Sequence, residues 1–537
     1  MIVAALVPMG GVLSNRPLDG HEVLVAQSAR EMMASGDYLV PSFNDEARLK
    51  KPPLMYWLVI GVAKVIPGAG DVPEWAARLP SWLAGIALVG VTMALGWRVG
   101  GRAMGVLAGL LLATSVGYFT LTNSARPEMV YGALGGLTTL GFVRATLAGD
   151  RTAAQRRGAL VGWIGFGLAT LAKGPHLPGL ILLGVVVHLL VSRQARRVPA
   201  VTRPFMGLVV LVLIVGPWAA ALIVHAPETV DVWYHELIGN SSGDEGSGLL
   251  AHVSAYYLHA PFRLLLPWAP CVVLGLFAPW SKRSSDFEAV RVLFWIVIAT
   301  LVVMTIPDHR RWYYLIPIAP ALAVMSAAGT LGAMRVMTPR RSVRMFGTFM
   351  VILIVVGAGA ALIEVSQPMR VGPVVVVVMA LVIGAAVMAA VSCRRAACGV
   401  TVGAAVFAWA ALFTLTGHLH GWWGEQRYEE WRFAEVVAER VPDDDPLYTW
   451  RVDEAVLVYA TDRAVERVRD LDDIDNYPPE ETIWVVTREE FADDVSDEWR
   501  SWIIHESPPT AEDGYTEVLL ALRARGEPGG GATRTGG

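Results

Sequence analysis

Hydrophobic and polar positions follow each other along the chain in long blocks. Runs of mostly apolar residues recur from the start to about residue 417, and many approach the ~20 residues that a helix needs to cross a bilayer. We therefore predict a polytopic α-helical membrane protein with about 13 transmembrane helices. The predicted spans lie near residues 1–13, 75–97, 103–121, 129–147, 159–172, 176–191, 205–225, 263–280, 292–306, 313–334, 345–364, 371–391 and 399–417.

Two short apolar segments need a separate interpretation. Residues 1–13 lack a basic leading region and an A-x-A cleavage site. We interpret them as a first span, whose true start can lie upstream, and not as a cleaved signal peptide. Residues 53–66 fit either a short span or an interfacial or re-entrant piece.

Arginine and lysine gather in alternate loops, which predicts the orientation of the chain. The positive-inside rule places six basic loops in the cytoplasm and the loops between them outside. The six basic loops contain residues 98–102, 144–157, 193–203, 282–291, 335–344 and 394–395. The predicted outer loops contain residues 19–74, 123–128, 173–175, 225–262 and 308–312.

The character of the chain changes after His418. Trp431–Arg440 has an amphipathic helix pattern, and Thr482–Val486 and Tyr515–Leu522 have strand patterns. We predict a transmembrane domain over residues 1–417 with an outer loop over 14–74. A small soluble α/β domain follows over 418–525, and a Gly-rich tail over 526–537 is expected to be disordered. An odd number of spans places the α/β domain outside the cytoplasm.

Composition supports the membrane assignment and excludes other classes. Of 537 residues, 54% are hydrophobic and 17% charged, against about 25% charged in soluble proteins, and the mean hydropathy is +0.47. The net charge of −4 leaves no footprint for nucleic acid. Three cysteines lie in or beside apolar runs and show neither a disulfide framework nor zinc spacing.

The predicted outer loops hold the residues that could carry chemistry. Asp19 and Glu22 lie just beyond the first span, where a carboxylate could act as a general base. Asp19 could equally cap the helix that follows it. In the segment 123–128, Arg126 and Glu128 are costly at the mouth of a span unless they are paired or used.

Several cations also lie on the predicted outer side, against the positive-inside rule. Clustered cations at a membrane surface attract phosphate groups, although lipid contact and snorkelling remain the alternative. Aromatic residues such as Tyr56 and Trp57 beside them fit an interfacial belt. The outer cations are Arg48, Lys50, Lys51, Lys173, Arg310 and Arg311.

Four motifs resemble one family when they are taken together and in order. They are A-R-E-M-x-x-S-G-D-Y-L-V-P (29–41), K-P-P-L-M-Y-W (51–57), A-R-L-P-S (77–81) and R-R-W-Y-Y-L-I-P-I-A-P (310–320). This set is similar to the GT-C polyprenyl-phosphate-sugar transferases, which include the 4-amino-4-deoxy-L-arabinose lipid A transferases and the dolichyl-phosphate-mannose protein mannosyltransferases. The segment L-A-T-L-A-K-G-P (168–175) resembles the family's helix that ends in Lys-Gly. The resemblance covers roughly Asp19 to Pro320.

The resemblance implies a sugar donor carried on a polyprenyl phosphate and a lipid, glycan or protein acceptor, with no cofactor. It implies catalytic roles for Asp19, Glu22 and Glu128. Donor phosphate contacts are expected from Arg48, Lys51, Lys173, Arg310, Arg311 and Tyr314, and substrate contacts from His21, Tyr56, His252 and Tyr257.

The chain departs from the family pattern at two places. The expected Asp-Glu pair falls on His21 and Glu22, so the assignment of the base is divided between Asp19 and Glu22. Lys50 stands where the arabinose-type members have a Glu that can take part in a metal site, so we expect no metal of that kind.

Two other functions were weighed against sugar transfer. A transporter or flippase would place ionisable residues near the middle of its spans, whereas here they lie at span ends and in outer loops. A scaffold or sensor would leave the outer cations unexplained. We therefore expect a multi-pass glycosyltransferase of a bacterial inner membrane, with its active site and α/β domain facing the periplasm; the sequence specifies neither sugar nor acceptor.

The predicted orientation can be tested with a reporter. A reporter that is active only in the cytoplasm should stay silent when fused after residue 425, because an odd number of spans precedes that point. The same reporter fused after residue 195, in a basic loop, is the positive control. Activity from the fusion at 425 would contradict the topology.

Overall fold

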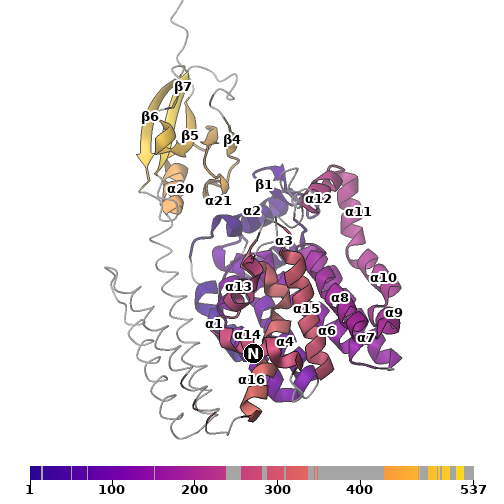
Figure 1. Ribbon diagram of the computed structural model, residues 1–537. Helices are drawn as coiled ribbons and strands as arrows, with labels where there is room; N and C mark the ends of the chain where they lie inside the picture. Colours follow the sequence, from indigo (N-terminus) through magenta and orange to yellow (C-terminus); the bar gives the residue numbers. More distant parts are fainter. Residues whose placement is uncertain are drawn as a thin grey trace, which may run out of the picture.

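The computed structural model describes residues 1–13, 16–49, 51–68, 70–149, 151–237, 255–280, 287–307, 310–336, 429–469, 482–492, 499–507 and 516–524, with a few isolated residues between them. Up to residue 336 these residues are almost entirely helical, and they form the large body in Figure 1. In chain order its elements are α1 (Ile2–Val12), α2 (Gly20–Ser35), β1 (Ser42–Phe43), β2 (Glu46–Ala47), α3 (Leu54–Val65), α4 (Glu74–Ala113), α5 (Val116–Thr122), α6 (Pro127–Thr146), α7 (Thr152–Ala172), α8 (His176–Val191), η1 (Ala195–Arg197), α9 (Val198–Thr202), α10 (Pro204–Ile214), α11 (Gly216–His225), α12 (Thr229–Leu237), α13 (Tyr256–Leu264), α14 (Ala269–Phe277), η4 (Ala278–Trp280), α15 (Phe287–Met304), η5 (Trp312–Ile318) and α16 (Ala319–Val336).

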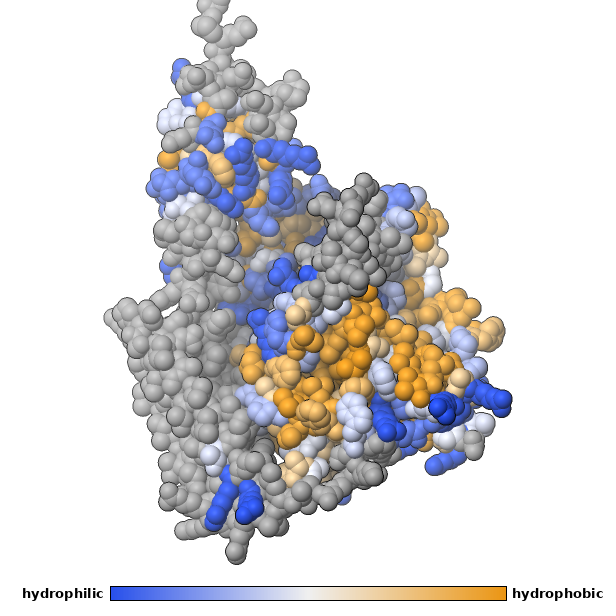
Figure 2. Space-filling view, viewed as in Figure 1, coloured by the Kyte–Doolittle hydropathy of each residue, from blue (hydrophilic) through white to orange (hydrophobic). Residues whose placement is uncertain are grey.

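The helices bear out the membrane character of the chain. Within the described residues, three helices are long and apolar enough to cross a membrane, or four if α13 and α14–η4, bent by 115°, count as one broken span. Hydrophobic side chains gather over the middle of the helical body, and hydrophilic ones lie at its lower edge (Figure 2). The spans predicted at 345–364, 371–391 and 399–417 lie outside the described residues, so the total of 13 stays a prediction.

The stretch from Glu74 to Ala113 is assigned as one helix but contains a turn. The backbone leaves the helical conformation at Gly100 and Gly101, and Gly101 has a φ of +83°. Beyond this turn, a Cβ atom added to Gly105 would lie 2.6 Å from the carbonyl oxygen of Met93. The two halves of α4 therefore pack back against each other, which fits the separate spans predicted at 75–97 and 103–121. The second half is helical only to Ala113, and α5 follows as a separate short helix.

Neighbouring helices pack closely where the residues at their contact are small. Gly141 of α6 lies directly against the backbone of Gly162 in α7, so that a Cβ atom at position 141 would clash with the Gly162 nitrogen. Small residues at such contacts let the backbones of membrane helices approach. This packing places the N-terminus of α6 beside the C-terminus of α7, where Glu128 and Lys173 meet.

The described C-terminal part contains a five-stranded sheet in the order β4-β3-β5-β7-β6. Strand β3 runs parallel to β4 and β5, whereas β7 is antiparallel to β5 and β6. The strands are β3 (Leu447–Trp450), β4 (Glu466–Val468), β5 (Ile483–Arg488), β6 (Trp499–Glu506) and β7 (Glu517–Ala524), and the helices are α20 (Glu429–Arg440), α21 (Ala455–Thr461) and α22 (Glu489–Ala492). The predicted helix at 431–440 and the strands at 482–486 and 515–522 correspond to α20, β5 and β7. The domain boundaries at 417 and 525 stay predictions.

This C-terminal part is docked on the loop that follows α1. The hydroxyl of Tyr459 in α21 donates to the carbonyl of Val72 at 3.1 Å, and the guanidinium of Arg30 lies 3.8 Å from the centre of the Tyr459 ring. Asn44 exchanges two hydrogen bonds, of 2.7 and 2.8 Å, with the backbone of Val465. Figure 1 shows α21 beside α2 at this contact. The C-terminal part that contains the sheet thus contacts and stabilises the predicted outer loop.

Candidate active site

Polar side chains converge where several helix ends meet. Arg126 is the N-cap of α6, Lys173 is the C-cap of α7, and Arg311 is the N-cap of η5. Asp19 is the N-cap of α2, which comes from the loop after α1. The contacts below join these ends into one cluster, although the residues come from positions 19 to 314 of the chain.

The centre of the cluster is an ion pair between Glu128 and Lys173. The Lys173 ammonium lies 2.6 Å from Oε1 of Glu128, and the two side chains are 13% and 9% exposed. The same ammonium lies 4.6 Å from the centre of the Tyr314 ring and 5.7 Å from that of Tyr313. The second carboxylate oxygen of Glu128 is buried and has no hydrogen-bond partner within the described residues. The site therefore presents a lysine fixed on one side by a carboxylate and covered by aromatic faces.

Asp19 joins the cluster through Arg126. Its Oδ2 accepts a hydrogen bond from the Arg126 guanidinium at 2.9 Å. Burial alone would lower the pKa of Arg126, but the negative charges of Asp19 and Glu128 raise it. Arg126 thus binds Asp19 directly and also interacts with the charge of Glu128, so it stays positively charged near both carboxylates.

Asp19 also caps α2, which was one of the two roles predicted for it. Its Oδ1 accepts from the backbone N–H of Glu22 at 2.8 Å, and Oε2 of Glu22 accepts from the Asp19 N–H at 3.0 Å, which forms a capping box. The Asp19 side chain nevertheless remains 40% exposed. Capping and chemistry are therefore compatible, since the carboxylate is held in place and still reaches the outside.

Glu22 has a different environment, fully buried among hydrogen-bond donors. Its Oε1 accepts from Nε of Arg78 at 2.9 Å and from the backbone N–H of Ala125 at 2.8 Å. Its Oε2 accepts from Arg78 at 3.0 Å and from Arg16 at 3.1 Å, in addition to the Asp19 N–H. Burial by itself would raise the pKa of this carboxyl, but the charges of Arg78 and Arg16 and these hydrogen bonds lower it to about 2. A carboxylate so saturated is a poor proton acceptor and a strong structural anchor.

The cations predicted to bind phosphate largely gather near the pair of Glu128 and Lys173. The charges of both Lys173 and Lys51 act on the His176 ring at the start of α8. On the other side, Tyr257 interacts with the charge of Arg310 and with Tyr314, and its hydroxyl donates to the Arg311 carbonyl at 3.4 Å. The charge of Arg311 acts on the neighbouring Tyr313.

The remaining predicted residues lie elsewhere. Arg48 hydrogen-bonds to Tyr56 and lies 6.0 Å from the centre of the Phe43 ring, so this pair belongs to the loop before α3. His21 is exposed on the first turn of α2. His252 and Lys50 lie outside the described residues, as do Asp308 and His309 of the motif before Arg310.

Three members of the cluster were given no role in the predicted site. They are Arg126, which was noted only as a costly charge beside Glu128, Tyr313, which lies inside the motif 310–320, and His176, which directly follows the motif 168–175. Arg126 precedes Pro127 and Glu128, and His176 follows K-G-P. Their adjacency to the motifs was the available signal, but only the packing of the helices shows which neighbours face the cluster.

Comparisons with known proteins agree with the resemblance drawn from the motifs and confirm it. Residues 50–220 match the family described as dolichyl-phosphate-mannose-protein mannosyltransferase. An undecaprenyl phosphate-alpha-4-amino-4-deoxy-L-arabinose arabinosyl transferase of Aeromonas salmonicida is 25% identical over 337 residues, which cover 60% of this chain and 58% of the relative. An uncharacterised protein of Aquifex aeolicus is 26% identical over 318 residues, which cover 57% of this chain and 58% of the relative. The chain thus spans little more than half the length of these curated relatives.

The fold has a solved counterpart. A crystal structure of ArnT from Cupriavidus metallidurans, bound to undecaprenyl phosphate, superposes with a TM-score of 0.77 at 21% identity and covers 97% of this chain and 96% of that chain. The chain therefore has the helical membrane fold of that GT-C glycosyltransferase.

The anchoring of Glu22 predicts a stability effect. Glu22→Gln leaves Arg78 buried without its carboxylate and should lower the free energy of unfolding by about 3–5 kcal/mol, as is typical when one partner of a buried pair is removed. Thermal unfolding of purified protein at pH 7 measures the difference. Glu46→Gln, at an exposed position of β2, is the matched control.

The stabilisation that Glu22 contributes should depend on pH, and the direction of this dependence can be predicted. The folded pKa of about 2 lies below the ordinary 4.5, so the stabilisation is fully present above pH 4.5 and is lost as the pH falls towards 2. The gap in melting temperature between wild type and Glu22→Gln should narrow over that window. A variant that melts like the wild type but has lost turnover would show that Glu22 is the base.

Proposed function

We propose that this chain is an integral membrane glycosyltransferase that moves a sugar from a polyprenyl-phosphate donor to a lipid, glycan or protein acceptor at the outer face of a bacterial inner membrane. The observation that carries the proposal is the fixed, half-enclosed cation of Lys173. It is held by Glu128, covered by Tyr314, and accompanied by Lys51, Arg310 and Arg311. Such a group suits a phosphate with an apolar chain attached.

The proposed reaction places these cations at the leaving group. The acceptor oxygen or nitrogen forms a bond to the anomeric carbon as the bond from that carbon to the phosphate oxygen breaks. The phosphate leaves with the bonding electron pair, and its growing negative charge is stabilised by the preorganised cations. Because Glu128 already fixes the ammonium of Lys173, little reorganisation is needed when the charge develops.

Asp19 is the proposed general base, which removes the proton of the acceptor. Its carboxylate is partly exposed, and it is oriented by the capping hydrogen bond and by Arg126. Glu22 keeps the family's second acidic position but is buried and saturated, so we assign it the role of holding the loop that presents Asp19. Glu128, whose second oxygen lacks a hydrogen-bond partner among the described residues, is the alternative base.

The placement of ionisable residues favours transfer over transport. Asp19, Arg126, Glu128 and Lys173 all lie at or next to a helix end, not midway along a helix. A carrier would need such residues near the centre of its spans. The outer-face location rests on the positive-inside rule, since the basic loops occupy the opposite helix ends. Mass spectrometry of glycolipids and envelope proteins from a deletion strain would identify the sugar and the acceptor.

The base assignment predicts a selective loss of rate. Asp19→Asn should reduce turnover by about 10²–10⁴, as removal of a general base typically does. Folding should survive, because Asn caps helices about as well as Asp. Turnover is measured with a polyprenyl-phosphate sugar and a crude acceptor fraction, beside retention of polyprenyl phosphate. Asp37→Asn, in an exposed part of the same loop, is the matched control. A near wild-type rate for Asp19→Asn would move the base to Glu128.

The phosphate role of Lys51 predicts weakened donor use. Lys51→Ala should raise the donor concentration needed for half-maximal rate while the yield of folded protein stays unchanged, because Lys51 is not part of an apolar core. Lys64→Ala, an exposed lysine at the end of α3 that hydrogen-bonds to Tyr38, is the control and should behave like wild type. Unchanged donor dependence in Lys51→Ala would remove Lys51 from the phosphate site.

A further inference from the structure

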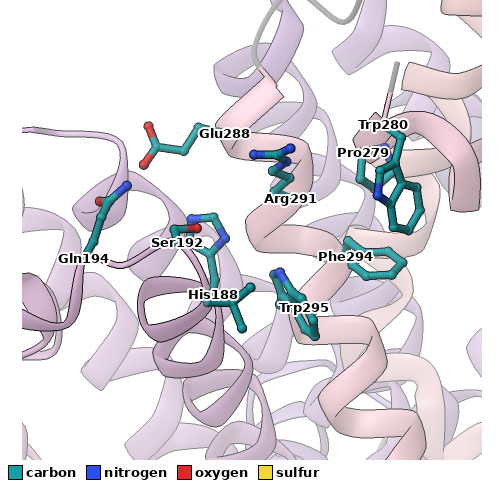
Figure 3. Close-up of a pocket in the computed structure, with 10 residues that line it drawn as sticks. His188, Ser192, Gln194, Pro279, Trp280, Glu288, Arg291, Phe294 and Trp295 are labelled. Atoms are coloured by element: carbon teal, nitrogen blue, oxygen red, sulfur yellow. The ribbon is translucent and has the colours of Figure 1, made fainter. Parts of the chain in front are cut away.

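A second polar site lies at the opposite helix ends from the proposed active site. A cavity of about 530 Å³ opens between the end of α8 and the beginning of α15. His188 and Ser192 line it from the α8 side, and Glu288 and Arg291 from the α15 side, as Figure 3 shows. The volume falls in the range of roughly 300–1,000 Å³ that is usual for small-ligand sites.

His188 is the feature that calls for a ligand. It is 1% exposed, and within the described residues neither of its ring nitrogens has a hydrogen-bond partner. In Figure 3 its ring faces the space between α8 and α15. Buried polar groups are almost always hydrogen-bonded in native proteins, so a residue that only fills space at this position would be apolar. The imidazole therefore has capacity to bind a group inside the cavity.

The charges around the cavity favour an anion. Arg197 lies 3.7 Å from Glu288 and offsets its carboxylate, and Arg291 adds a second guanidinium at the rim. The charges of Glu288, Arg291 and Arg197 all act on His188. Among the described residues that line the cavity, Arg291, His188 and Ser192 offer guanidinium, imidazole and hydroxyl donors that a phosphate group could accept from.

The opposite wall of the cavity is aromatic and apolar. Trp280, 62% exposed, meets Phe294 edge to face at 5.0 Å, and Phe294 meets Trp295 at 5.5 Å. Aromatic rings of this kind belong to the membrane interface, where headgroup and chain regions join. A ligand that places a phosphate at Arg291 can thus lay an alkyl chain along these rings.

We propose that this cavity binds an anionic membrane phospholipid through its phosphate group. Gln194 and Arg291, which line the cavity, belong to the basic loops predicted at 193–203 and 282–291, and the positive-inside rule places both loops on the cytoplasmic side. Basic pockets between helices on that side suit anionic headgroups. The site is separate from the proposed donor site, because Lys173 lies just before the first turn of α8 and His188 lies in its last turn.

The test counts lipids retained by the purified full-length protein in native mass spectrometry. Phosphatidylglycerol should be retained at least tenfold more strongly than phosphatidylcholine. His188→Leu and Arg291→Gln should each lose one tightly held phosphatidylglycerol, while the exposed Arg98→Gln at the same helix ends keeps it. His188→Leu replaces an unsatisfied polar group by an apolar one, so its melting temperature without lipid should not fall. Should that variant fail to fold, Arg291→Gln at the rim carries the test.

Two further experiments show which part of the lipid is recognised and at which site the lipid is held. Competition by inorganic phosphate would show that the phosphate group alone is recognised; its failure to compete would show that the lipid chain is required, and either result supports the site. Lys173→Gln should leave the phosphatidylglycerol count unchanged, which separates this lipid from one held at the donor site. Equal retention of phosphatidylglycerol by wild type, His188→Leu and Arg291→Gln would overturn the proposal, as would equal retention of phosphatidylcholine.

Discussion

The buried carboxylate of Glu22 is the interaction on which the outer end of the molecule depends. It accepts hydrogen bonds from Arg78 in α4, Arg16 in the linker after α1, and the backbone N–H of Ala125 before α6. Arg78 in turn donates to the carbonyls of Arg16 and Pro17. Three segments that are distant in the sequence are thus fixed around one negative charge. The capping box between Glu22 and Asp19 ties the position of Asp19 to this network.

The same constraint, that buried charge must be compensated, organises the proposed active site. Glu128 and Lys173 are each nearly buried, and each offsets the other's desolvation. Arg126 and the tyrosines around Lys173 complete this balance, but one oxygen of Glu128 lacks a hydrogen-bond partner within the described residues. The Glu128–Lys173 ion pair and the oxygen of Glu128 that lacks a partner thus belong to the same site. A bound substrate could donate a hydrogen bond to that oxygen.

The sequence predicted the general organisation because hydropathy and charge act locally. The helical membrane character, the capping role of Asp19 and the strand predicted at 482–486, which is observed as β5, each follow from neighbouring residues. Long-range pairing did not follow. Glu22 was predicted as a possible base because its position matched a motif, and only the folded chain shows Arg78 against it. The strand β6, Trp499–Glu506, was missed because most of its residues are exposed or half-buried and give no clear alternation. His188 and Arg291 are about a hundred residues apart, so no spacing rule joins them.

The docking of α21 on the loop after α1 bears on the order in which the molecule is completed during synthesis. The loop from Leu18 to Val72 leaves the ribosome early, yet it is braced by Trp431, Tyr459 and Val465, which emerge after every predicted span has been made. Domains generally fold as they emerge, N-terminal parts first, but this loop cannot reach its final contacts on that schedule. Its last stabilising contacts form only once the late segments have been delivered to the same side of the membrane. Completion of this loop is therefore coupled to the delivery of residues made hundreds of positions later.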